Sequence, residues 1–208
     1  MNSSPRISRR WFLVALLGVG VTAWAAEKKA APGPNEPAPS TRSFFITGVT
    51  SESDVKAVSA AVLKVKSVTS VVDLTPTSGL ANIAFDHHAV THQQIAQAIL
   101  DAGAYQVAFK FIVADYAKDG NAPKIDAVFA RLAKLVTIEP LDKTRNLFVI
   151  RFLPFTATGV KPLGDGFNFG HIAHPIGDPA PKGLGLRIQQ VNEGSLARPG
   201  AGKKKAKE

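Results

Sequence analysis

The order of two hydrophobic periodicities along the chain constrains its fold most strongly. Short runs rich in β-branched and aromatic residues predict strands, and apolar residues spaced three and four positions apart predict helices. The patterns alternate as strand, helix, strand, strand, helix, strand, and the six segments lie at 44–47, 55–65, 68–75, 80–86, 91–102 and 105–113. This βαββαβ order predicts an α+β fold of the split βαβ, or ferredoxin-like, type.

The ends of the two predicted helices carry capping residues. Thr91 is followed three positions later by Gln94, which predicts a capping box, and Gly103 stands just after the last apolar position of that helix. Ser51 can cap the first helix, and the carboxylate of Asp54 in its first turn complements the helix dipole. We therefore interpret Ser51 and Asp54 as structural residues at the start of the first helix.

Two motifs in this region resemble the heavy-metal-associated domain family, whose members are small copper and heavy-metal carriers. The segment 48–54 reads Gly-Val-Thr-Ser-Glu-Ser-Asp, and 95–103 reads Ile-Ala-Gln-Ala-Ile-Leu-Asp-Ala-Gly. In the family the first motif is Gly-Met-Thr-Cys-x-x-Cys, so Ser51 and Asp54 stand at the positions of the two metal-binding cysteines. The resemblance covers about a third of the chain, and it implies a ferredoxin-like fold and a role in metal binding or transport.

The residues at these two positions argue against the family's metal chemistry. Paired thiolates at a helix N-terminus suit Cu⁺, because sulfur is polarizable, whereas a hydroxyl and a carboxylate are hard ligands. The whole chain contains no cysteine, so it has no disulfide, no thiolate site and no cysteine nucleophile. The sequence therefore predicts that the fold of the family is retained and that its thiolate site is lost.

Histidines are the remaining candidate metal ligands. His87, His88 and His92 lie close together before and at the start of the second predicted helix, and His171 and His174 are three residues apart. Imidazole binds Zn²⁺ and Cu²⁺ readily, so a divalent transition metal is the cofactor that either cluster would take. The alternatives are an exposed polar loop for the first cluster and, for the second, a segment that docks through Phe167 and Phe169.

The N-terminal part of the chain predicts export. Residues 1–26 carry three arginines before a short apolar run and an Ala-Trp-Ala cleavage pattern, and Ser-Arg-Arg-Trp-Phe-Leu at 8–13 resembles the twin-arginine motif. An ordinary secretory signal and an uncleaved anchor are the alternatives. Residues 27–42 contain four prolines among Ala, Lys and Asn, which is typical of an extended linker. We expect a periplasmic or otherwise exported bacterial protein, with no transmembrane span in the mature chain.

A weak internal repeat follows the first domain, which we place at 43–113. Residues 114–193 show a helix pattern at 125–135, two strand patterns at 136–141 and 147–155, and a candidate closing strand at 184–191. The stretch 158–183 is rich in Gly and Pro and predicts a loop. This region is interpreted as a diverged, loop-rich second α+β unit packed on the first.

The remaining charge is concentrated at the C-terminus. The formal charge of +9 falls to about 9 − 3 = +6 when residues 1–26 are removed, and residues 194–208 include four lysines in the last six positions. A solvated, disordered tail is the favoured interpretation; a weak contact with anionic lipid or cell-wall polymer is the alternative.

Several function classes lack their sequence signals. The strand at 80–85 has no basic-aromatic pattern for stacking RNA bases, and the chain has no nucleophile elbow and no phosphate-binding loop in a strand–helix context. The sequence predicts a non-enzymatic protein that does not bind nucleic acid. It either retains a metal-related role or acts as a structural or protein-binding module, and its partner is then another envelope protein.

Overall fold

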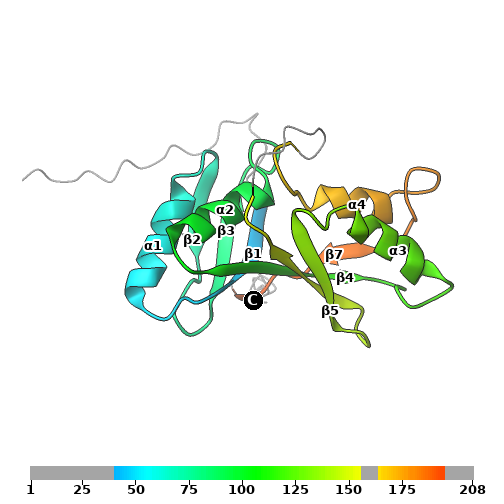
Figure 1. Cartoon of the computed structure of the whole chain (residues 1–208), viewed down its shortest axis with the longest axis horizontal. Helices are drawn as coiled ribbons and strands as arrows, with labels where there is room; N and C mark the ends of the chain where they lie inside the picture. The colour runs from blue at the N-terminus through cyan, green and yellow to red at the C-terminus, as the bar shows by residue number, and fades with distance from the viewer. Residues whose placement is uncertain (1–39, 156–163, 195–208) are drawn as a thin grey trace, which may run out of the picture. The chain divides into compact units, whose positions relative to one another are not determined.

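The computed structural model describes residues 40–155 and 164–194, all within one compact unit of residues 36–208. The predicted export signal, the linker up to residue 39 and the basic tail from 195 lie outside the described residues. The elements, labelled in Figure 1, are β1 (Ser40–Thr47), α1 (Glu52–Leu63), β2 (Val68–Val72), β3 (Leu80–Phe85), α2 (His92–Ala102), β4 (Gln106–Val113), α3 (Asn121–Ala130), β5 (Val136–Asp142), β6 (Leu147–Phe152), α4 (Gly170–Gly177) and β7 (Ile188–Gln190).

The first six elements confirm the predicted ferredoxin-like unit. Their strands are ordered β2-β3-β1-β4 and are all antiparallel to their neighbours. The two helices begin as their sequences predict, because Ser51 and Thr91 each form a complete capping box with the residue three positions later. β1 begins at Ser40, so the last three residues of the predicted linker belong to this strand.

β4 is the strand that joins the first unit to the second. It is the last strand of the first unit and also the first strand of a second βαββαβ unit, which continues through α3, β5, β6, α4 and β7. The second unit has the strand order β5-β6-β4-β7, which is the same relative order as in the first. The eight residues of β4 therefore serve both as the last strand of the first unit and as the first strand of the second. The described residues form a single seven-stranded sheet rather than two packed domains.

The pairing of β4 shows how two strands use the same edge. Ala108 pairs with both β1 and β6, and Phe111 pairs with both β6 and β7. Both β1 and β7 therefore lie on the edge opposite β6, where β1 pairs with residues 106–108 and β7 pairs with residues 111–113. Residues 40–44 of β1 pair with β3 and not with β4. Along the part of β4 that β1 does not reach, β7 pairs with residues 111–113 instead.

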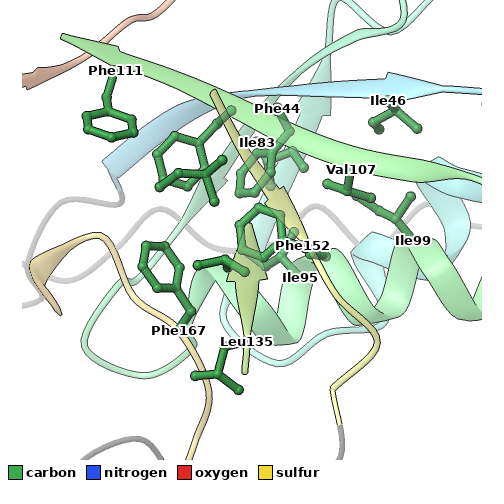
Figure 2. Packing of buried hydrophobic residues seen from close by; sticks show 14 of the residues in the cluster. Phe44, Ile46, Ile83, Ile95, Ile99, Val107, Phe111, Leu135, Phe152 and Phe167 are labelled. Atoms are coloured by element: carbon green, nitrogen blue, oxygen red, sulfur yellow. The ribbon is translucent and has the colours of Figure 1, made fainter. Parts of the chain in front are cut away.

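One hydrophobic core fills the helix-facing side of this sheet. Phe109 of β4 lies 6.5 Å from Phe44 of β1 and 5.8 Å from Phe152 of β6, measured between ring centroids. Figure 2 shows Phe44 and Phe152 packed together with Ile95 of α2. Every helix contributes buried apolar residues to this cluster: Val58 and Val62 from α1, Ile95 and Ile99 from α2, Ile125 and Val128 from α3, Ile172 and Ile176 from α4. All four helices therefore cover the same face of the sheet (Figure 1).

The prediction of a loop over 158–183 is wrong for α4. Gly170–Gly177 is helical although Pro175 lies inside it. A proline inside a helix costs about 3 kcal/mol, whereas complete burial of an isoleucine contributes about 1.5–3 kcal/mol. Ile172 and Ile176 are both fully buried, so tertiary packing outweighs the local preference. Residues 156–163 of the predicted loop lie outside the described residues.

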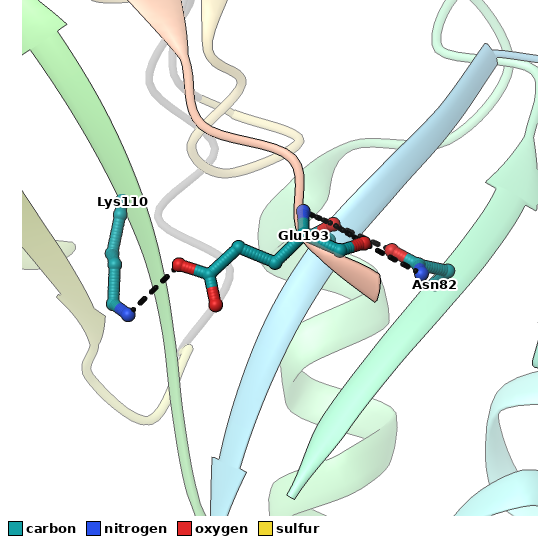
Figure 3. Close-up of polar contacts among 4 residues, drawn as sticks. Asn82, Lys110 and Glu193 are labelled. Carbon is teal, nitrogen blue, oxygen red and sulfur yellow. Dashed lines mark hydrogen bonds and ion pairs between the residues drawn. The ribbon is translucent and has the colours of Figure 1, made fainter. Parts of the chain in front are cut away.

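A polar junction holds the chain after β7 against the opposite face of the sheet. Ser43 and Asn82 point to this face because their neighbours Phe44 and Ile83 face the helices, and both polar side chains are fully buried. Ser43 Oγ accepts from the Glu193 backbone N–H at 2.9 Å, and Asn82 Nδ2 donates to the Glu193 carbonyl at 3.0 Å. The Glu193 carboxylate also pairs with Lys110 of β4 at 3.1 Å (Figure 3). These contacts tie the end of the second unit across β1 to β3.

Candidate functional site

The β1–α1 loop carries the candidate metal positions of the sequence analysis. Ser51 has extended backbone angles and is the N-cap of α1, and its hydroxyl accepts from the Asp54 N–H at 3.2 Å. The Asp54 carboxylate in turn accepts from the Ser51 N–H at 2.9 Å. The predicted roles of Ser51 and Asp54 as a helix cap are confirmed.

Both carboxylate oxygens of Asp54 are engaged. Oδ2 accepts from the backbone N–H groups of Thr50 and Ser51, each at 2.9 Å, and from their hydroxyls at 3.0 and 2.8 Å. Oδ1 accepts from the phenolic hydroxyl of Tyr105 at 3.1 Å. The Thr50 backbone N–H and the Ser51 hydroxyl are the main groups that hold the pKa of the Asp54 carboxyl well below its usual range.

Tyr105 reaches this loop from the segment before β4. Burial and its bond to Asp54 raise the pKa of the phenol, so Tyr105 remains a hydrogen-bond donor at neutral pH. Gly48 permits the close approach, because its φ is +99° and a Cβ there would lie 3.0 Å from the Ala104 carbonyl oxygen. The contact of Tyr105 with Asp54 was not predicted from the sequence, because a single aromatic residue two positions after Gly103 gives no periodic signal.

The loop is therefore a closed set of hydrogen bonds around one carboxylate. Its acceptors are directed at backbone N–H groups that have no partner inside the helix. Binding a cation through Asp54 would require these hydrogen bonds to rearrange, and the nearest other side-chain ligand is the neutral Ser51 hydroxyl. The arrangement suits helix capping and leaves little coordinating power for a soft metal ion.

The first histidine cluster does not converge on one point. The rings of His87 and His88 lie 3.9 Å apart between centroids, and His87 Nδ1 contacts Ser40 Oγ at 3.4 Å. His92 is instead 2% exposed and lies among the rings of three phenylalanines of the core: Phe44, Phe85 and Phe109. Its Nδ1 is 2.7 Å from Asn168 Oδ1, in the segment before α4.

The second cluster is also divided by the structure. His171 Nδ1 accepts from the Asn168 backbone N–H at 3.1 Å, whereas the exposed His174 pairs with Asp178 at 3.4 Å. Asn168 thus contacts His92 and His171, which belong to different predicted clusters. Among the described residues, no group of three or more His, Asp or Glu side chains has the arrangement of a metal site. Asn168 was missed in the sequence analysis because no pattern marks an isolated amide between two phenylalanines.

Comparisons with known proteins give similarities only to solved structures. No family model and no curated protein matches the sequence. Oxidized MerP from Ralstonia metallidurans CH34 is 30% identical over 32% of this chain and 90% of its own, with a TM-score of 0.30. The CopZ metallochaperone is 27% identical over 32% of this chain and 96% of its own, with a TM-score of 0.30. The N-terminal soluble domains of Bacillus subtilis CopA are 13% identical over 75% of this chain and 97% of theirs, with a TM-score of 0.33.

These similarities do not establish a family or an activity, because the TM-scores are low. The fold assignment rests on the strand order and register of the sheet described above. In the part of the chain that the structure describes, no helix is both long enough and apolar enough to span a membrane.

Proposed function

We propose that this chain is a non-enzymatic binding module of the bacterial envelope that acts through contacts with another protein. The observation that carries this proposal is the closed β1–α1 loop, in which Asp54 and Ser51 satisfy one another and the first turn of α1. A loop of this kind positions backbone and supports a fold, but it offers no thiolate to a metal. The heavy-metal carrier resemblance then describes the scaffold rather than the present activity.

The proposed location rests on the first 26 residues. Their twin-arginine-like motif, apolar run and Ala-Trp-Ala pattern support export, and residues 27–39 would separate the cleaved or retained signal from the sheet. Residues 195–208 carry the basic tail, which would add a weak attraction to an anionic surface.

Calorimetric titration of the purified protein with Zn²⁺, Cu²⁺ and Cu⁺ tests the proposal. We expect no stoichiometric, saturable heat for any of the three ions at micromolar protein. Binding of one ion per chain that disappears in the double variant Ser51→Ala/Asp54→Asn would return the loop to a metal-binding role. Binding that disappears in His87→Gln/His88→Gln would instead support a histidine site and a function in metal homeostasis.

A further inference from the structure

Asn168 forms a polar link between the two βαββαβ units. It precedes α4 of the second unit and contacts His92, the first residue of α2 in the first unit. Two further bonds join the same segments, from the Gln93 N–H to the Phe167 carbonyl at 3.0 Å and from Thr91 Oγ1 to the Asp165 carbonyl at 2.7 Å. The start of α2 is therefore the docking position for residues 165–168.

The directions of these hydrogen bonds fix the protonation of two histidines. Asn168 Nδ2 donates to the His87 carbonyl at 3.2 Å, so Oδ1 is the atom that faces His92 and His92 Nδ1 must carry a proton. The Asn168 backbone N–H donates to His171 Nδ1, so that nitrogen must be unprotonated. His92 then carries its only proton on Nδ1, and His171 carries its only proton on Nε2.

Protonation is unfavourable at both histidines in the closed junction. A proton on His171 Nδ1 would oppose the Asn168 N–H donor directly. A second proton on His92 would lie on Nε2, which is buried and has no hydrogen-bond partner among the described residues. Burial accordingly lowers the pKa of His92 to about 3, and burial followed by the charge of His174 lowers the pKa of His171.

The charged groups around this junction favour the neutral histidines. Arg42 on β1, His87 and His171 all act against a positive charge on His92. The nearby carboxylates interact with other histidines. Burial lowers the pKa of His87 by more than the charge of Asp86 raises it, and Asp178 pairs with the exposed His174. Asp165 faces α2 through its main-chain carbonyl. The ring of His88 lies 3.9 Å from that of His87, between centroids, and its charge also lowers the pKa of His87.

We propose that the His92–Asn168–His171 junction is an acid-sensitive latch, which holds residues 164–177 on α2 at neutral pH and opens more often when the surroundings become acidic. The inference does not depend on the proposed function. A histidine that is neutral in the closed latch and has the ordinary pKa of 6.5 when released makes opening about 30-fold more favourable at pH 5 than at pH 7.5. His92 meets this condition, and His171 acts in the same direction.

Hydrogen–deuterium exchange with mass spectrometry at pH 7.5 and pH 5, corrected for intrinsic exchange rates, tests the latch. We expect residues 164–177 to lose protection at pH 5 by at least about tenfold more than α1 does. His171→Asn should reduce this difference, because the Asn oxygen can accept from the Asn168 N–H without titrating. His174→Asn, one helical turn away and exposed, is the matched control and should retain most of the wild-type difference, because His174 acts on His171 only through its charge.

An equal loss of protection across the sheet, or the same pH dependence in His171→Asn as in His174→Asn, would overturn the proposal. If His171→Asn is not folded at pH 7.5 by circular dichroism, the imidazole ¹⁵N resonances of the wild type decide. The latch requires the proton on Nδ1 of His92 and on Nε2 of His171. The opposite assignment for either ring would overturn it.

Discussion

The buried hydroxyl of Ser43 offers a direct test of how the second unit is tied to the first. Ser43 Oγ accepts from the Glu193 N–H, the Ser43 O–H donates to Asn82 Oδ1, and the side chain is fully buried. Ser43→Ala leaves that N–H without its acceptor inside a contact that water does not reach freely. An unsatisfied buried donor costs ~1–3 kcal/mol, so we expect the free energy of unfolding to fall by about that amount.

Urea denaturation followed by far-UV circular dichroism measures the effect, which corresponds to roughly 2–4 °C in Tm for each kcal/mol in a chain of this size. Ser70→Ala is the matched control, because Ser70 lies in β2 and its side chain has no hydrogen bond with any residue that the structure describes. We expect the control to change stability by less than ~0.5 kcal/mol. In a chain ending at Gln190, Ser43→Ala should lose most of its effect, because its partner Glu193 is absent. A Ser43→Ala effect no larger than that of Ser70→Ala would refute the assigned role of the junction.

Three further predictions concern the loop and the signal. Ser51→Ala should cost ~1 kcal/mol in urea melts, and Ser51→Thr should cost less, because its hydroxyl can still accept from the Asp54 N–H and donate to the Asp54 carboxylate. EDTA should change neither result, because the lost interaction is a helix cap. The pKa of the Asp54 carboxyl is lowered in the folded protein, so this group stabilises the fold above its ordinary pKa of 3.8, and the stabilisation is lost as the pH falls below that value. In urea melts over this pH range, the free energy of unfolding should therefore fall less for Asp54→Asn than for the wild type. Arg9→Lys/Arg10→Lys should leave unprocessed precursor in the cytoplasm, as seen by immunoblotting of cell fractions, whereas normal processing would exclude the twin-arginine route.

The first unit could be predicted because its local signals agree with its tertiary structure. Val58 and Val62 repeat at helical spacing and are buried, and Ala81 and Ile83 alternate on the helix-facing side of β3. The capping boxes at Ser51 and Thr91 depend only on residues three positions apart, which a sequence displays directly. The cap at Ser51 was therefore predictable, whereas the bonds from Thr50 and Tyr105 to the Asp54 carboxylate were not predicted.

The second unit was only partly predictable, because its stability depends on contacts distant in the sequence. α4 contains Pro175 and begins and ends with glycine, so its helix depends on burying Ile172 and Ile176 in the hydrophobic core. The sequence also contained no sign that β4 belongs to both units. A strand can pair along both of its edges, and its sequence does not show which strands are its neighbours. The Tyr105–Asp54 and Asn168–His92 bonds join residues 51 and 76 positions apart, which no local pattern reports.

The central claim is that the β1–α1 loop caps α1 and does not bind Cu⁺. The most direct test is the affinity for Cu⁺ of the natural chain and of the variant Ser51→Cys/Asp54→Cys, measured by competition with a colorimetric chelator. The account predicts that the natural chain leaves the chelator complex intact. It predicts that the variant removes one Cu⁺ per chain, because it places two thiolates at the N-terminus of α1, at the cysteine positions of the motif that this segment resembles. Single replacements at either position should bind much more weakly than the pair. Removal of Cu⁺ by the natural chain, or failure of a folded double variant to bind it, would contradict the account.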